Sequence, residues 1–168
     1  MNAHSTIEPV DTIEWNVFKT EANLWRGRML EHFAAVEHAV TETLIHLGAG
    51  SAGKKLPHLA GQRREALRLA LASGGGSLGK PALDALVQFQ READHRAFVC
   101  HGVGRLLVDQ QRQWHLYMTI LAPDDTDQEV AWTISKSASE QLVRRLNASS
   151  RCVIDRLANF RNAVPAIV

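Results

Sequence analysis

The sequence predicts a mainly all-α protein, a bundle of four to five helices with a small β-hairpin between the third and last helices. Apolar residues recur every three or four positions over most of the chain, which is typical of amphipathic helices. One shorter segment alternates apolar and polar residues with a period of two, as strands do. With 168 residues, 45% of them hydrophobic, and a net charge of +1, we expect a single domain spanning residues 1–168.

The segment from Asp11 to Gly48 is predicted to form one long amphipathic helix. Asp11 or Thr12 can cap its start, and Gly48 and Gly50 can end it. Residues 1–10 before it are expected to be a flexible N-terminus. The apolar stripe that defines this helix consists of Phe18, Ala22, Trp25, Met29, Phe33, Val36, Val40, Leu44 and Leu47.

The predicted length of this helix suggests an oligomer. At 1.5 Å per residue it would be about 55 Å long, which exceeds the width of a small domain. We therefore expect that it either bends near Gly27 or packs in part against a second subunit. A homodimer is the simplest form of the latter.

Three more helices are predicted. The second covers residues 56–73, and a glycine-rich break at 74–77 separates it from the third. The third has Pro81 in its first turn and continues to Ala97. The last begins at Ser135 or Ser137 and continues to about residue 162.

The hairpin is predicted at residues 102–121, where the hydrophobic period changes. In its second strand Trp114, Leu116 and Met118 alternate with more polar residues, so one face should be buried. The acidic stretch 122–132 that follows is expected to be a surface loop. Trp25 and Trp114 fit the buried faces, whereas the pattern does not decide between core and contact surface for Trp15 and Trp132.

The net charge conceals an asymmetry between the ends of the chain. Residues 1–50 carry seven acidic and three basic side chains, and residues 133–168 carry six basic and two acidic ones. One interpretation is that the two terminal segments pack side by side with complementary charge. The other is a basic C-terminal surface that binds phosphate groups.

Several classes of protein are excluded by composition. No apolar run reaches the roughly 20 residues of a membrane-spanning helix, so no membrane partner is expected. Two cysteines do not make a secreted disulfide scaffold. No signal peptide is visible at the N-terminus, and we therefore expect a cytoplasmic protein.

Metal, cofactor and common hydrolase chemistry find no support in the motifs. The eight histidines lack the spacing of zinc or di-iron ligands, so we expect no metal and no cofactor. Cys100 and His101 are sequence neighbours whose side chains diverge, and Cys100 is expected to be a small core residue. No Gly-x-Ser-x-Gly elbow is present.

The stretch Asp94–Gly102 is the candidate site, because Arg96 and His101 in it are separated by four mostly apolar residues. An arginine offers a permanent fork of donors to a phosphodiester, and a histidine can transfer a proton near neutral pH. Together they could promote attack of an RNA 2′-hydroxyl on its own phosphate. The structural alternative is that Arg96 caps a helix or pairs with an acid such as Asp94, while His101 bonds a backbone carbonyl.

An arginine, four residues, and a histidine followed by glycine at the end of a helix resemble the signature of the HEPN superfamily (higher eukaryotes and prokaryotes nucleotide-binding domain). Members are helical bundles, often homodimers, and many are metal-independent endoribonucleases, including toxins. The resemblance implies that Arg96 orients the scissile phosphate and His101 acts as general acid or base, with two sites facing each other across a dimer. Active members often have a polar residue after the arginine; here that residue is Ala97, and Asp94 or His95 could supply the polar group.

The sequence thus supports two hypotheses. The first is a HEPN-like dimer that cleaves or binds RNA, with a protein partner such as an antitoxin. The second is a non-catalytic helical dimer that binds a protein or ligand. A small-molecule enzyme using His115 or Tyr117 would be a third, but no motif supports it.

Overall fold

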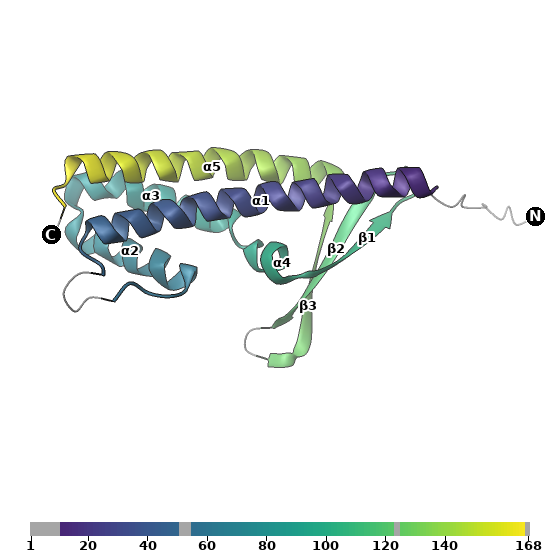
Figure 1. Cartoon of the computed structure of the whole chain (residues 1–168), viewed down its shortest axis with the longest axis horizontal. Coiled ribbons are helices and arrows are strands. Elements are labelled where there is room, and N and C mark those ends of the chain that lie inside the picture. The colour runs from purple at the N-terminus through teal and green to yellow at the C-terminus, as the bar shows by residue number, and fades with distance from the viewer. Residues whose placement is uncertain (1–10, 51–54, 123–124, 167–168) are drawn as a thin grey trace, which may run out of the picture. The chain divides into compact units, whose positions relative to one another are not determined.

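The computed structural model describes residues 11–50, 55–122 and 125–166, and in these ranges the chain is mainly helical (Figure 1). The flexible N-terminus expected at residues 1–10 lies outside the described residues. The elements follow in the order α1 (Thr12–His46), α2 (Ala60–Gly74), α3 (Gly76–Glu92), α4 (Arg96–His101), β1 (Val103–Val108), β2 (Trp114–Ala122), β3 (Asp125–Ser135) and α5 (Lys136–Ala163).

The first helix is confirmed in its position, cap and buried face. Asp11 accepts a hydrogen bond from the backbone N–H of Glu14 at 2.7 Å, so Asp11 is the cap. The helix continues without interruption through Gly27. Its buried residues include eight of the predicted stripe, namely Phe18, Ala22, Trp25, Met29, Phe33, Val36, Val40 and Leu44.

A third strand replaces the surface loop expected at residues 122–132, and that expectation is wrong. β3 pairs antiparallel with β2, and the sheet has the order β1-β2-β3. The acidic residues at the start of the stretch obscured an alternation of Val130, Trp132 and Ile134, the period of a strand with one buried face. Ile134 lies opposite Leu116, and Trp132 lies opposite Met118.

The glycine-rich break between α2 and α3 is shorter than predicted. Only Gly75 separates the two helices. A Cβ atom at this position would lie 2.6 Å from the carbonyl oxygen of Leu71 and 2.8 Å from the Cα of Gly79. The glycine therefore permits a close approach of two helices rather than a flexible loop. The third predicted helix is also divided, since α3 ends at Glu92 and α4 is a separate short helix.

The chain divides into two compact units, and α1 and α5 contribute to both. The first unit contains residues up to Met29 and His95–Val143, and the second contains Leu30–Asp94 and the residues from Arg144 onward.

The core of the first unit lies on one face of the sheet. Trp114, Leu116 and Met118 of β2 are buried, as the period-two pattern predicted. The indole N–H of Trp25, from α1, donates a hydrogen bond to the carbonyl of Ser139 in α5 at 3.0 Å. One face of a three-stranded sheet is therefore covered, which is the usual arrangement for an antiparallel sheet beside helices.

The core of the second unit is formed by helices alone. The rings of Phe33 and Phe89 pack edge to face, with centroids 6.3 Å apart. Arg161 of α5 donates a hydrogen bond to Thr43 at 2.8 Å and lies 3.2 Å from a carboxylate oxygen of Glu42. Opposite charges of the two terminal segments thus meet at this point, as the side-by-side interpretation of the charge asymmetry expects.

The same complementarity occurs in the first unit at Glu21. Its carboxylate accepts hydrogen bonds from Lys136 at 2.8 Å and from the indole N–H of Trp114 at 2.9 Å. The hydrogen bond from Lys136 is the main cause that lowers the pKa of Glu21 below its ordinary value of 4.5. The charged form of Glu21 therefore stabilises the fold.

We predict that Glu21→Gln lowers the free energy of unfolding by about 0.5–1 kcal/mol at neutral pH, because the ion pair is partly exposed to solvent. The amide oxygen can still accept from Trp114, so the variant isolates the charge. Since the pKa of Glu21 is lowered on folding, its contribution is present above pH 4.5 and is lost as the pH falls through the lowered pKa. Urea denaturation at several pH values measures the difference in free energy of unfolding between wild type and Glu21→Gln. Glu140→Gln is the exposed control. A difference that persists undiminished in acid would contradict the assignment.

Candidate functional site

The short helix α4 carries both residues of the predicted site. Arg96 is its first residue and is half-buried, whereas His101 is its last and is exposed. At 3.6 residues per turn, an offset of five residues places the two side chains about 140° apart around the helix axis. Within one chain the structure therefore puts Arg96 and His101 on one helix but not on one face of it.

The ring of His101 has no hydrogen bond or ion pair within the described parts of the chain. The half of the structural alternative in which His101 bonds a backbone carbonyl is therefore not what the structure contains. A solvent-exposed imidazole keeps both nitrogen atoms accessible for proton transfer.

The C-terminus of α4 is held by an arginine of the first helix. The Nε of Arg26 donates to the carbonyl of Val99 at 2.6 Å, and its Nη2 donates to the carbonyl of Gly102 at 3.1 Å. Carbonyls in the last turn of a helix have no partner within the helix, and a cation there also interacts favourably with the helix dipole. Sequence reasoning missed Arg26, because nothing local links it to a segment more than seventy residues away.

Gly102, after the histidine, is required by a close approach. A Cβ atom there would lie 2.4 Å from the carbonyl oxygen of Phe98. The backbone N–H of Gly102 donates to that same carbonyl at 2.9 Å. Its φ of −68° is ordinary, so steric contact rather than an unusual dihedral angle excludes a side chain.

His95 has a packing role. Its ring centroid lies 4.1 Å from that of Trp132, which also contacts Phe98 at 5.8 Å and Trp25 at 6.1 Å. Half-buried Trp132 is thus the centre of an aromatic cluster that joins β3, α1 and the segment containing α4. The question left open for Trp132 is answered by this packing.

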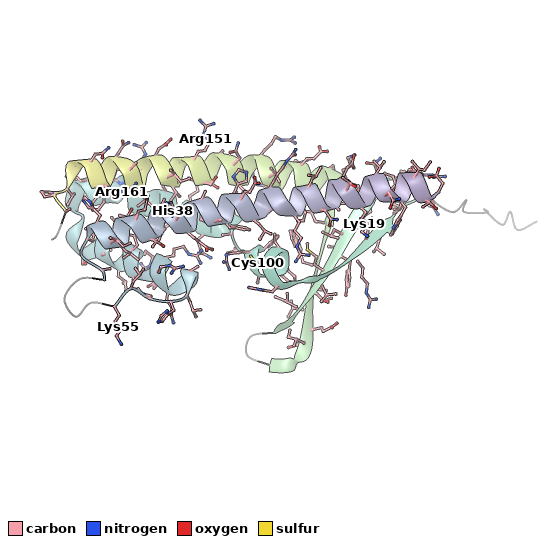
Figure 2. The ribbon with its side chains drawn as sticks, viewed as in Figure 1. Lys19, His38, Lys55, Cys100, Arg151 and Arg161 are labelled. Atoms are coloured by element: carbon pink, nitrogen blue, oxygen red, sulfur yellow. The ribbon has the colours of Figure 1, made fainter. Side chains whose placement is uncertain are left out.

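The remaining residues of the stretch contribute less. Asp94 is exposed and accepts a long hydrogen bond of 3.4 Å from Gln90. Cys100, shown on α4 in Figure 2, is half-buried rather than a fully buried core residue. Trp25 and Trp114 are buried as predicted, and Trp15 is exposed.

His115 and Asp109 form a pair in the first unit. The Nε2 of His115 lies 2.8 Å from a carboxylate oxygen of Asp109. That contact is the main cause of a lowered pKa for Asp109, and the backbone N–H groups of Gln113 and Gln111 lower it further. These bonds close the turn between β1 and β2, so the pair has a structural role.

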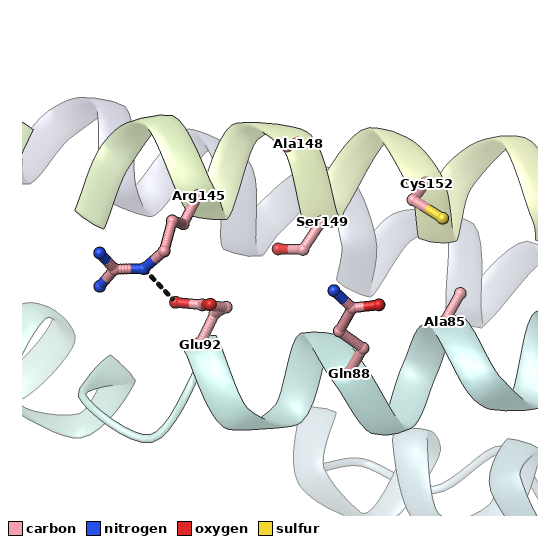
Figure 3. Close-up of a pocket in the computed structure, with 7 residues that line it drawn as sticks. All are labelled: Ala85, Gln88, Glu92, Arg145, Ala148, Ser149 and Cys152. Carbon is pink, nitrogen blue, oxygen red and sulfur yellow. Dashed lines mark hydrogen bonds and ion pairs between the residues drawn. The ribbon is translucent and has the colours of Figure 1, made fainter. Parts of the chain in front are cut away.

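A small cavity lies in the second unit between α3 and α5 (Figure 3). Its volume is about 280 Å³, at the lower limit for sites that hold small molecules. Glu92 and Arg145 pair with each other at 3.2 Å at one end, and the exposed Cys152 lies along its rim. Its two charged groups pair with each other, so neither charge is left for a ligand.

Neither a metal cluster nor a membrane helix is present in the described part of the chain. No three His, Cys, Asp or Glu side chains there are close enough together to hold a metal ion. None of the helices there combines the length and apolar character needed to cross a bilayer. Comparison with protein-family models, curated proteins and solved structures gives no match to this chain.

We predict that Arg26→Met destabilises the protein by about 1–3 kcal/mol, because two carbonyls at the end of α4 lose their charged donor. The methionine retains most of the apolar stem. Amide hydrogen exchange should show the loss of protection concentrated in residues 96–102, and thermal unfolding should show a lower Tm. The exposed Arg28→Met is the matched control, and equal exchange in both variants would argue against the cap.

We predict that Gly102→Ala destabilises the protein by about 1–3 kcal/mol through overpacking against the Phe98 carbonyl. Gly104→Ala is the control two residues away, since its Cβ would make ordinary contacts of 3.4 Å and 3.8 Å with Leu116 and Met118. Denaturant unfolding of the two variants compares them directly. Similar stabilities of the two variants would mean that the backbone at position 102 can shift enough to accommodate a Cβ atom, and would contradict the prediction.

Proposed function

We propose that this protein is a cytoplasmic, HEPN-like homodimer that cleaves RNA without a metal ion, through Arg96 and His101. The observation that carries the proposal is the exposed, unbonded ring of His101 at an α4 terminus held by Arg26. A histidine with a merely structural role would be expected to use its ring nitrogens within the fold. The second support for the proposal is the Arg-x4-His-Gly pattern, which resembles the HEPN signature.

The chemistry requires one proton transfer at each end of the reaction. A neutral His101 would accept the proton of the ribose 2′-hydroxyl while the 2′-oxygen attacks the adjacent phosphorus. The bond from phosphorus to the 5′-oxygen breaks, that oxygen takes up a proton, and a 2′,3′-cyclic phosphate remains. Arg96 would hold the nonbridging phosphate oxygens, whose negative charge increases during attack.

The geometry of α4 favours a dimeric site. Arg96 and His101 of one chain diverge by about 140° around the helix, so a phosphate held by one arginine is better placed for the histidine of a second copy. A second chain facing the first would complete two such sites. This is a reason to expect activity only in the dimer.

A non-catalytic helical dimer is the second candidate, and one observation favours it. Ile13, Val17 and Leu24 are all exposed on the first half of α1. Their spacing places them within about 40° of one another around the helix, as one apolar row. Such a row is suited to pack against another helix whether or not RNA is cleaved.

We predict that the wild-type protein cleaves single-stranded RNA in EDTA and that His101→Ala lowers the rate at least about 100-fold, because general acid–base catalysis contributes that much. Arg96→Gln should lower it as well. The exposed His58→Ala is the matched control and should cleave like wild type. Gel analysis of end-labelled RNA gives the rates, and light scattering gives the mass in solution. A stable dimer without cleavage, or equal rates for wild type and His101→Ala, would favour the non-catalytic alternative.

A further inference from the structure

One face of the sheet in the first unit has no covering element within the described residues. Trp114, Leu116 and Met118 of β2 point to the core and are buried, while the side chains that alternate with them point away. We call this second set, from all three strands, the outer face. Arg105 of β1, Tyr117 of β2 and Thr133 of β3 lie side by side across its middle.

The outer face carries more apolar side chains than is usual for a sheet face that contacts only water. Val103, Leu107 and Leu121 are 70%, 50% and 59% exposed, and all three belong to it. A solvated face of an antiparallel sheet normally carries polar residues at such positions. Val103 and Leu121 lie toward one end of this face and Leu107 toward the other, on either side of Arg105 and Tyr117. Exposed apolar side chains on one face are typical of a binding surface.

The centre of this face combines a ring with a cation. Arg105 and Tyr117 are direct cross-strand partners, so their Cβ atoms are about 4.5–5.5 Å apart. Arg105 is exposed and Tyr117 half-exposed. Neither side chain has a hydrogen bond or ion pair to another part of the described chain. The guanidinium and the ring are thus both available to a ligand.

No acidic side chain that the structure describes pairs with Arg105. Asp109, at the end of β1, is engaged by His115. Glu129 lies opposite Leu121, four residues along β2 from Tyr117 and therefore about 13 Å away along the strand. A ligand that fits this surface has a flat apolar group for the tyrosine and a negative charge for the arginine, as a nucleotide of a single strand has.

We propose that the outer face is a platform for single-stranded RNA, on which one base stacks on Tyr117 and a neighbouring phosphate binds Arg105. The inference rests on the proposed function, and it adds the surface that holds the substrate. Gly102 alone separates His101 from β1, which is an edge strand of the sheet. A strand of RNA that passes over this edge would therefore connect the platform with the end of α4.

The test measures binding of a fluorescently labelled single-stranded RNA oligonucleotide of mixed sequence to the full-length His101→Ala protein, which would leave the RNA intact. In that background we expect Tyr117→Ala to weaken binding about tenfold, the effect of losing one stacked base. Tyr117→Phe, which keeps the ring, should bind like its parent. Arg105→Gln should weaken binding and reduce the slope of log K against log salt by about 0.7, the value for one phosphate contact on a single strand.

Arg151→Gln is the matched control, since Arg151 is an exposed arginine of α5 whose side chain points away from the helix (Figure 2). It should leave both affinity and salt slope unchanged. Circular dichroism of each variant checks that the fold is retained.

The outcomes separate the platform from the proposed function. If wild type cleaves RNA but Tyr117→Ala and Arg105→Gln bind RNA as their parent does, the platform is wrong and the nuclease assignment stands. If the parent does not bind RNA, the platform is wrong whatever the cleavage result. A change of oligomeric mass in Tyr117→Ala with unchanged RNA binding would identify the outer face as a contact between copies and would also overturn the proposal.

Discussion

Two consecutive side chains of α1, Trp25 and Arg26, hold the first compact unit together. The indole of Trp25 bonds the Ser139 carbonyl and packs against Trp132, so it joins α1 to the start of α5 and to the sheet. Arg26 points about 100° further around the helix and caps the end of α4. Neighbouring positions on one helix thus determine where the sheet and the candidate site lie.

The candidate site depends on these contacts because α4 is too short to be stable alone. A six-residue helix forms too few internal hydrogen bonds to offset the cost of nucleation. Its position comes from Arg26 at one end, from the tilted packing of His95 against Trp132 at the other, and from the close approach at Gly102. The exposure of His101 is a consequence of this frame, since the polar contacts that fix the helix do not use the imidazole ring.

The two faces of the sheet differ in what they contact. The inner face is occupied by the aromatic and aliphatic contacts of α1 and α5, and Glu21 adds a charged link to Trp114 and Lys136. The outer face carries exposed apolar side chains around a ring and a cation.

The sequence by itself determined the long first helix, the last helix and the period of β2. The stripe on α1, the cap at Asp11 and the alternation from Trp114 to Met118 are local patterns, and each is present as predicted. It also singled out Arg96, His101 and Gly102 by their spacing. Local periodicity indicates which face of a segment is buried, and it can be recognised from neighbouring residues alone.

Only the tertiary structure decided which distant groups meet. That residues 125–135 form a strand depends on an open edge of β2 to pair with, which the acidic composition of the segment did not reveal. The single-residue junction at Gly75 and the cap from Arg26 likewise depend on how closely separate helices approach. A hydrogen bond between segments more than seventy residues apart leaves no periodic trace in the sequence, because its geometry exists only once both segments are folded.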